Sequence, residues 1–165
     1  MKAWSHRPIE EANLLNPAFV STVLTAAICG YETESNNGMP LPVVHMIAPV
    51  VLRKSTREKL PKTVRSSLAV WLQKNTEYRI LFAERVVALK PYLSEALVFG
   101  FQNDRFSVLP DGCLGAGCDM KEIDKQIRLL KGEAKECVNK AKFLGKWFAL
   151  AGSPQTLMAL WGIRP

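Results

Sequence analysis

Near the N-terminus, the apolar run at 17–30 has the features of a buried helix with marked ends. The Asn16 side chain can cap the free N–H groups of a first turn, and Pro17 stands where a helix needs no N–H donor. We place the end of this helix at Gly30, because a residue without a β-carbon adopts the left-handed cap conformation at no cost. Residues 31–39 are then expected to form a surface loop.

The next segment, at 40–52, is apolar almost throughout and is followed by basic residues. An apolar run of this length fits either a buried helix or a buried strand. Pro49 argues against a central strand, because the hydrogen-bond ladder of a sheet needs the N–H that proline lacks. We therefore predict a buried helix, which completes an N-terminal helical part over residues 1–62.

Further along, apolar positions spaced three and four apart predict a helix at 63–74 and a second helix that begins after Asn75-Thr76. Pro91 interrupts the second pattern. Since proline is tolerated in the first turn of a helix and not in its interior, we predict that a third helix begins there and runs to residue 102.

A β-hairpin is expected directly after these helices. Residues 106–108 alternate between apolar and polar, and Pro-Asp-Gly at 110–112 is a turn after which the chain can return. Helices joined by a short turn and followed by a two-stranded ribbon are arranged as in a winged helix-turn-helix, here over 63–120. The alternative is a small helical bundle that carries a hairpin.

A sustained heptad seam runs from residue 123 to 148, and its steps of four and three predict a helix of about 30 residues and about 45 Å. The seam consists of Ile123, Ile127, Leu130, Ala134, Cys137, Ala141, Leu144 and Phe148. Such a face needs a partner, which is either another protein or the core of this chain. Ile123, Ile127 and Leu130 are candidates for binding a partner protein.

Together these patterns predict a mainly α fold: a helical domain with a winged helix-turn-helix-like core, one small β-hairpin as the wing, and a long C-terminal helix. The chain has 165 residues, of which 48% are hydrophobic, and this fits one domain over 1–165 whose last part, 121–165, holds the heptad helix and a tail. The composition excludes a disordered chain, and four Cys are too few for a disulfide scaffold. No signal peptide or membrane span is visible, so we expect a cytoplasmic protein with reduced thiols and no membrane contact.

The formal net charge of +7 is concentrated in two segments. Residues 53–65 carry six basic residues against one acidic, and residues 121–165 carry nine against four, whereas the rest of the chain is slightly acidic. The cations of the first segment are candidates for contacting nucleic-acid phosphates, with a solvated face as the alternative. They are Arg53, Lys54, Arg57, Lys59, Lys62 and Arg65. The second segment interleaves its cations with carboxylates, as a solvated or partner-facing helix flank does.

If the hairpin is a wing, the helix before it, at 92–102, would be the one to enter a DNA major groove. That helix contains Glu95 and no Lys or Arg, whereas base-reading helices supply Arg, Lys, Asn or Gln. Leu97, Phe99 and Phe101 are therefore expected to contact protein, and they are further candidates for partner binding. The winged region would then be an interaction module and not a sequence-specific reader.

Motifs for catalysis or metal binding are missing from the sequence. Cys113 and Cys118 have the spacing C-x4-C without a second paired motif, so we expect ordinary thiols and no metal. His45 lies in an apolar run and is expected to be a hydrogen-bonded core residue, not a base. There is no nucleophile elbow, and Gly-Ala-Gly at 115–117 lacks the lysine of a P-loop. We expect a protein that is not an enzyme and holds no cofactor.

Two stretches of the chain resemble a known family. EANLLNPAFVSTVLTAAICGY at 11–31 and GMPLPVVHMIAPVVLRKSTREKLP at 38–61 resemble the middle component of bacterial three-component ABC (ABC-3C) systems, a group that includes the small subunit of Lamassu-type anti-phage defence. The shared features are a Leu-Asn-Pro-Ala-Phe helix start at 15–19 and a Thr-Arg-Glu-x-Leu-Pro tail at 56–61. The closing LWGIRP at 160–165 also resembles the end of the family's chains.

The resemblance implies a non-catalytic subunit that sits with an SMC- or Rad50-like coiled-coil ABC ATPase and a separate effector, commonly a nuclease, in defence against phage or plasmids. Within such a complex, the basic segment at 53–65 could touch double-stranded DNA without reading its sequence. The alternative function is a free-standing winged-helix transcriptional regulator, which would bind its own promoter in a sequence-dependent way.

Overall fold

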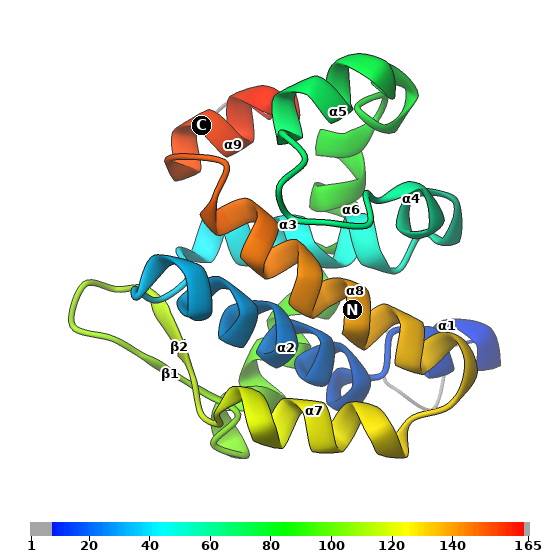
Figure 1. Cartoon of the computed structure of the whole chain (residues 1–165). Helices are drawn as coiled ribbons and strands as arrows, with labels where there is room; N and C mark the ends of the chain where they lie inside the picture. The colour runs from blue at the N-terminus through cyan, green and yellow to red at the C-terminus, as the bar shows by residue number, and fades with distance from the viewer. Residues whose placement is uncertain (1–7, 164–165) are drawn as a thin grey trace.

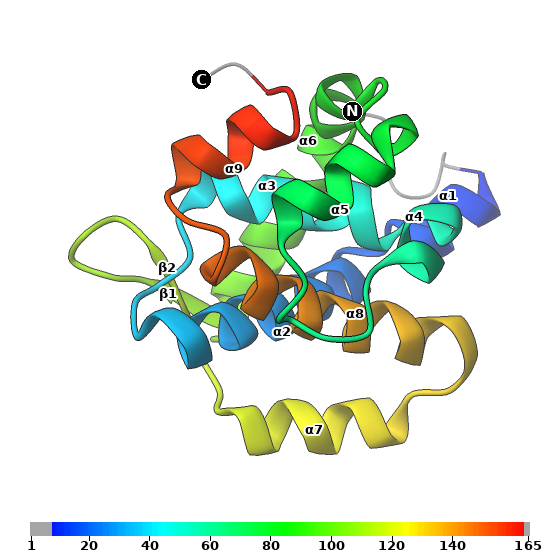
Figure 2. The same cartoon turned by 45° about the horizontal axis from the view of Figure 1, so that its top comes forward.

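The fold is mainly helical, as predicted, with one two-stranded sheet in the part of the chain, residues 8–163, that this computed structural model describes. The helices are α1 (Ile9–Leu14), α2 (Pro17–Ser35), α3 (Leu41–Val51), α4 (Lys54–Lys59), α5 (Leu68–Lys74), α6 (Phe82–Gln102), α7 (Met120–Leu129), α8 (Gly132–Ala149) and α9 (Pro154–Leu160), and the strands are β1 (Phe106–Val108) and β2 (Leu114–Ala116). A 3-10 helix, Thr76–Tyr78, precedes α6. Helices α2 and α8 cross the middle side by side, α7 follows one edge, and α5 and α9 lie at the opposite end (Figure 1, Figure 2).

Helix α2 lies at the centre of the core and contacts α3, α6, α7, α8 and β2. It begins as predicted: the Asn16 side chain accepts a hydrogen bond from the backbone N–H of Ala18 at 2.9 Å, and Pro17 occupies the first turn. From Val20 to Tyr31 almost every residue is buried. Because other elements cover the helix on several sides, its sequence is apolar nearly all round instead of striped.

The predicted end of this helix at Gly30 is wrong, since α2 continues beyond it and closes at Asn36 in the left-handed conformation, with a φ of 56°. Gly30 is instead a point of contact with α8. A β-carbon at Gly30 would collide with the carbonyl oxygen of Lys142, and one at Gly145 would collide with that of Ala27. The two glycines let the backbones of α2 and α8 approach each other directly, and the loop expected after Gly30 is correspondingly short.

Helix α3 confirms the choice of a helix over a strand for the apolar segment at 40–52. Pro49 lies inside it, and every residue from Val43 to Val51 except His45 is buried. α3 contacts α6, α8 and α9 as well as α2, so it forms the second layer of the core. Within residues 8–163 no helix, α3 included, is long and apolar enough to cross a membrane.

The break predicted at Pro91 does not occur, because α6 runs without interruption from Phe82 to Gln102. Pro91 is exposed, so the carbonyl of Val87, which loses its helical N–H donor there, faces the solvent side of the helix. The second and third helices of the predicted winged helix are therefore one helix, without a turn between them. The winged helix-turn-helix core is not confirmed.

The predicted hairpin is present and is fastened to α2. Its strands pair antiparallel, with Phe106 opposite Ala116, and Met39 exchanges two backbone hydrogen bonds with Leu114 at 2.8 and 2.9 Å. The carboxylate of Glu32 on α2 accepts a hydrogen bond from the N–H of Ala116 at 3.1 Å. These bonds hold the base of the hairpin against the helical core.

The single long helix predicted over the heptad seam is two helices that double back. α7 ends at Leu129, Leu130 is extended, and Gly132 has a left-handed φ of 55°. The chain runs out along α7, turns, and returns along α8 (Figure 1). Both helices contact α2, so the apolar seam is covered by the chain's own core, which was the second of the two options that the sequence left open.

Candidate nucleic-acid and partner interfaces

The basic segment at 53–65 forms helix α4 and the loop that leads to α5. Five of its six cations are exposed: Arg53, Lys54, Lys59, Lys62 and Arg65. We call the chain from Lys59 to Ser67 the basic loop. Exposed cations that stand close together along the chain can neutralise neighbouring phosphates, and this interaction weakens as salt is added.

Arg57, the sixth cation, is only 2% exposed and has a structural role that the sequence did not reveal. Its guanidinium donates to the carbonyl of Val51 at the end of α3 at 2.8 Å, and it also pairs with the carboxylates of Glu133 and Glu136 on α8. Arg57 thus joins α3, α4 and α8. It is not available on the surface, so we correct the predicted nucleic-acid-binding set by removing it.

Two tryptophans hold the basic loop in place at its two ends. The indole N–H of Trp71 donates to the carbonyl of Lys59 at 3.1 Å, and the indole N–H of Trp147 donates to the carbonyl of Ser66 at 2.5 Å. The two rings meet edge to face, with centroids 5.6 Å apart. A buried indole needs an acceptor for its N–H, which signals such anchors in a sequence, but the pattern of residues does not say which carbonyl accepts.

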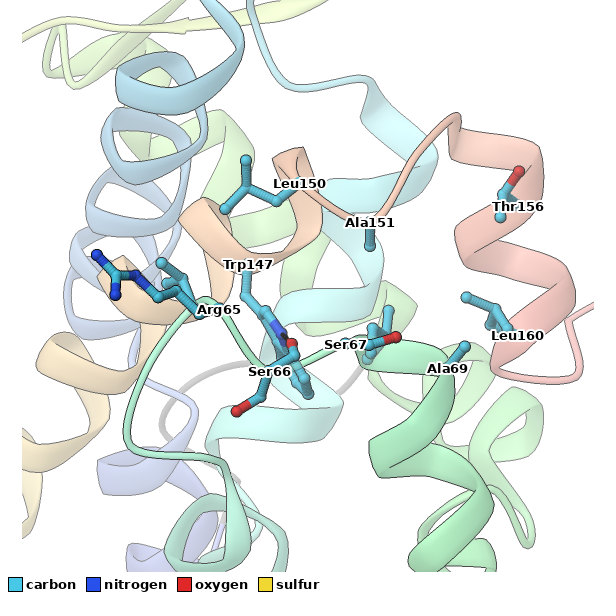
Figure 3. A pocket seen from close by; sticks show the side chains of 11 residues that line it. Arg65, Ser66, Ser67, Ala69, Trp147, Leu150, Ala151, Thr156 and Leu160 are labelled. Carbon is cyan, nitrogen blue, oxygen red and sulfur yellow. Dashed lines mark hydrogen bonds between the residues drawn. The ribbon is translucent and has the colours of Figure 1, made fainter.

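Behind the basic loop is a cavity of about 460 Å³ between the loop, the end of α8 and α9 (Figure 3). Its lining is mostly apolar, with Trp147 from α8, Leu150 just after the end of that helix, and Leu160 from α9. In Figure 3 Ser66 lies beside Trp147, while the Arg65 side chain extends away from the other lining residues. The described lining includes Ser and Thr hydroxyls but neither a histidine nor a carboxylate, so within that part of the chain none of these hydroxyls has a base beside it in the cavity.

The six residues predicted to bind a partner occupy different environments. Ile123 and Ile127 on α7 are buried in the core, and Leu130 is half-buried at the turn into α8. Leu97 and Phe99 on α6 are half-buried. Phe101 is 39% exposed, and its ring meets that of Phe106 edge to face with the centroids 5.0 Å apart. The structure therefore does not bring the six together on one surface.

The second basic segment, on α7 and α8, pairs part of its charge within the protein. The ammonium group of Lys142 contacts the carboxylate of Asp124, and that of Lys146 lies 3.6 Å from the carboxylate of Glu34. Such pairs leave fewer free cations on this side of the molecule than the sequence count indicates. The basic loop is therefore the stronger candidate for contact with a polyanion.

The four cysteines are free thiols, of which Cys29 and Cys137 are buried. Burial raises the pKa of Cys29 to about 11, and burial also raises the pKa values of Cys113, Cys118 and Cys137. Since a thiolate is the form that attacks a substrate or binds a metal, raised pKa values disfavour both roles at neutral pH. Among residues 8–163 there is no group of three or more His, Cys, Asp or Glu side chains that could hold a metal ion.

His45 is hydrogen-bonded, as predicted, but it is half-buried and not a core residue. Its Nδ1 lies 2.8 Å from the carbonyl oxygen of Leu41, one turn earlier on α3. The ring lines a surface groove between α3, α6 and α9. His45 therefore belongs to a groove that the sequence pattern did not predict.

The protein is thus mainly helical, with an anchored basic loop and with apolar grooves on its surface. A family model described as ABC-three component (ABC-3C) system Middle Component 3 matches residues 4–165, and the chain belongs to this family. Membership implies that it works beside an ABC ATPase component and an effector component. No match was found among curated proteins or among solved structures.

Proposed function

We propose that this protein is a non-catalytic assembly subunit of an anti-phage or anti-plasmid defence complex, in which it bridges a coiled-coil ABC ATPase of the SMC or Rad50 type and a nuclease-type effector. The observation that carries the proposal is the match to the middle-component family over residues 4–165. The stretches at 11–31 and 38–61 resemble ABC-3C middle components, a group that includes the small subunit of Lamassu-type defence, and a system of that kind is the one proposed. The complex acts in the cytoplasm, where phage and plasmid DNA are found.

A non-catalytic role is supported by the chemistry of the cavities and thiols. The described lining of the cavity behind the basic loop offers hydroxyl groups without a base, and burial keeps the thiols of Cys29 and Cys137 protonated at neutral pH. These features suit a protein that binds other proteins and leaves the chemistry to them.

Within the complex, the basic loop and α4 touch double-stranded DNA without reading its sequence. Three of the five exposed cations, Lys59, Lys62 and Arg65, stand on backbone that Trp71 and Trp147 hold in place, so little conformational entropy is lost when phosphates bind there. A free-standing winged-helix regulator is the weaker alternative, because the second half of α6, Tyr92–Gln102, carries no Lys or Arg to read bases.

The assembly role is tested by co-expression with the ATPase and the effector of the same system. We expect this chain to co-purify with both components at a fixed stoichiometry and to be required for their association with each other. A monomeric protein that binds neither component would overturn the proposal. Wild-type binding at fixed stoichiometry, with the effector still joining the ATPase when this chain is deleted, would reject the bridging role alone.

The DNA contact is tested by reversing three charges of the basic loop in Lys59→Glu, Lys62→Glu and Arg65→Glu. The assembled complex should bind duplex DNA more weakly, and the slope of log affinity against log salt should fall by about 3 because three phosphate contacts are lost. The matched control reverses three exposed cations of α7, in Lys121→Glu, Lys125→Glu and Arg128→Glu, and should change the slope less. An unchanged slope in the loop variant would reject the contact.

A further inference from the structure

An apolar groove of about 370 Å³ lies between the start of α3, the first half of α6 and the C-terminal segment around α9. Its lining comprises Leu41, Pro42, His45, Val86, Val87, Lys90, Met158 and Ile163. Side chains that proteins normally bury are open to solvent here: Val87 is 69% exposed and Leu41 is 42% exposed. Contiguous apolar surface of this kind marks a place where another molecule binds.

The apolar surface continues from the groove along the outer side of α6. Val87, Pro91, Ser94 and Val98 are exposed at spacings of three and four, so they form one stripe, which Phe101 extends. The stripe carries no charge and spans about 21 Å from its first to its last residue at the helical rise of 1.5 Å. The solvent-exposed face of a helix on a protein surface is normally polar, so this uncharged face of α6 is unusual.

At the start of α6, Leu81 adds an exposed and strained residue. It is 58% exposed and has a left-handed φ of 56°, a conformation in which the β-carbon of an L-residue crowds the following carbonyl oxygen. Arg79, just before it, lies close to Gly162 and therefore close to the Ile163 end of the groove. Backbone strain at an exposed position commonly accompanies a binding function.

The charged side chains at the groove are cationic. Lys90 and His45 are the titratable groups in the lining, and Arg79 stands at one end. Among the residues that the structure describes, no carboxylate lines the groove. An occupant with apolar side chains and one or more carboxylates would therefore bury apolar area and pair with cations at the same time.

We propose that the groove and the stripe on α6 bind an amphipathic helix of another component of the complex, with an apolar face and carboxylates beside it. A helix of about 14 residues covers 21 Å, which matches the length of the stripe, and helix-in-groove binding uses anchors at these spacings. A second copy of this chain fits less well, because a two-fold symmetric contact of the groove with itself would bring two cationic grooves together without a carboxylate to pair with Lys90. This inference rests on the proposed assembly function.

The test measures the affinity of the purified chain for the ATPase and for the effector of its system by titration calorimetry. In the double variant Val87→Glu and Val98→Glu, we expect the affinity for one of the two components to fall at least tenfold. The matched control, Val108→Glu and Leu129→Glu, adds the same charge at residues that are 62% and 78% exposed elsewhere, and should bind as the wild type does. Lys90→Glu should weaken the same affinity, and Lys90→Arg should retain it.

The outcomes separate this inference from the assembly role. If the wild type binds a component and the double variant binds it equally well, the docking surface is wrong while the assembly role stands. If the wild type is a dimer that the double variant converts to monomers, the occupant is a second copy and the inference is overturned. A wild type that binds neither component would overturn both. Circular dichroism of the variants checks that these surface changes leave the helices intact.

Discussion

At the scale of single residues, two glycines set the distance between the central helices. Gly30 on α2 and Gly145 on α8 each face a carbonyl oxygen of the other helix, at Lys142 and Ala27. In an exposed helix, replacing glycine by alanine stabilises the helix by about 1 kcal/mol. Here the added methyl group would enter the space that the opposite backbone fills, so packing outweighs helix propensity.

We expect Gly145→Ala to lower the free energy of unfolding by about 3 kcal/mol, because α8 must move away from α2 along its length. Urea denaturation measures the change. Asn139→Ala, at an exposed position on the same helix, is the control and should leave stability within about 0.5 kcal/mol. A stabilised Gly145→Ala protein would show that the helices are not in backbone contact.

Glu32 is another residue whose environment sets its chemistry. Desolvation by burial raises the pKa of its carboxyl group, although the hydrogen bond from the N–H of Ala116 opposes this. The folded state therefore binds a proton at a higher pH than the unfolded state does. As pH rises through this range, ionisation of Glu32 removes stability from the folded protein.

Glu32→Gln should keep the acceptor for the Ala116 N–H and cannot ionise. The free energy of unfolding of the variant, relative to the wild type, should therefore increase as pH rises from about 4 to about 7. Urea denaturation at a series of pH values measures this difference. A difference that stays constant over that range, or that falls, would contradict desolvation as the dominant influence on the Glu32 pKa.

At the scale of elements, Arg57 connects three helices. It lies on α4, donates to the last turn of α3 at Val51 and pairs with the exposed carboxylates of Glu133 and Glu136 at the start of α8. Removing it would leave the Val51 carbonyl without this donor and would open space among the three helices. The two carboxylates are about 60% exposed and remain hydrated, so their loss of a partner costs less than in a buried pair.

We expect Arg57→Ala to lower the free energy of unfolding by about 2 kcal/mol, from the lost hydrogen bond and the lost packing of the side-chain stem. Arg57→Lys should retain only part of this stability. A single ammonium group lacks the forked geometry by which the guanidinium reaches both the Val51 carbonyl and the carboxylates of α8. Lys54→Ala, at an exposed position of the same helix, should change stability by less than about 0.5 kcal/mol. Equal effects at the two positions would show that Arg57 does not join the helices.

The elements also show how far local patterns predict this fold. Asn16 and Pro17 mark the start of α2 because capping is a local interaction, and the apolar run at 40–52 is a helix as its proline indicated. Pro91 was misleading because a proline on the exposed side of a helix is tolerated when solvent faces the freed carbonyl. The heptad spacing was misleading in a different way: it continues across the turn at Gly132, since α7 and α8 both pack on α2.

The candidate surfaces were predicted less completely. The cations of the segment at 53–65 are visible in the sequence, but the burial of Arg57 depends on Glu133, which is 76 residues away. The apolar groove beside Val87 depends on α3, α6 and the C-terminal segment meeting in space. Contacts between distant parts of the chain leave no periodic signal, so composition and spacing cannot reveal them.

At the scale of the whole molecule, the two proposed binding surfaces belong to different elements. The basic loop joins α4 to α5, whereas the groove is built from α3, α6 and the segment around α9. α4 and α9 lie at separate places in both views (Figure 1, Figure 2), although α9 contributes Met158 to the groove and Leu160 to the cavity behind the basic loop. A chain with this arrangement can hold DNA at one surface while a helix of another component occupies the other, as a bridging subunit requires.

The indole anchors of the basic loop make the protein its own fluorescent probe. Trp71, Trp147 and Trp161 form one ring cluster, with centroids 5.6 and 6.3 Å from Trp71. In a Trp4→Phe variant, which removes the remaining indole, the emission comes from this cluster alone. We expect duplex DNA to shift the wavelength of this emission if binding displaces the basic loop and so changes the surroundings of the indoles. In the Lys59→Glu, Lys62→Glu and Arg65→Glu protein, DNA should leave the emission unchanged. DNA that binds without any such shift would mean that both indole hydrogen bonds persist and that the loop receives its ligand as a rigid platform.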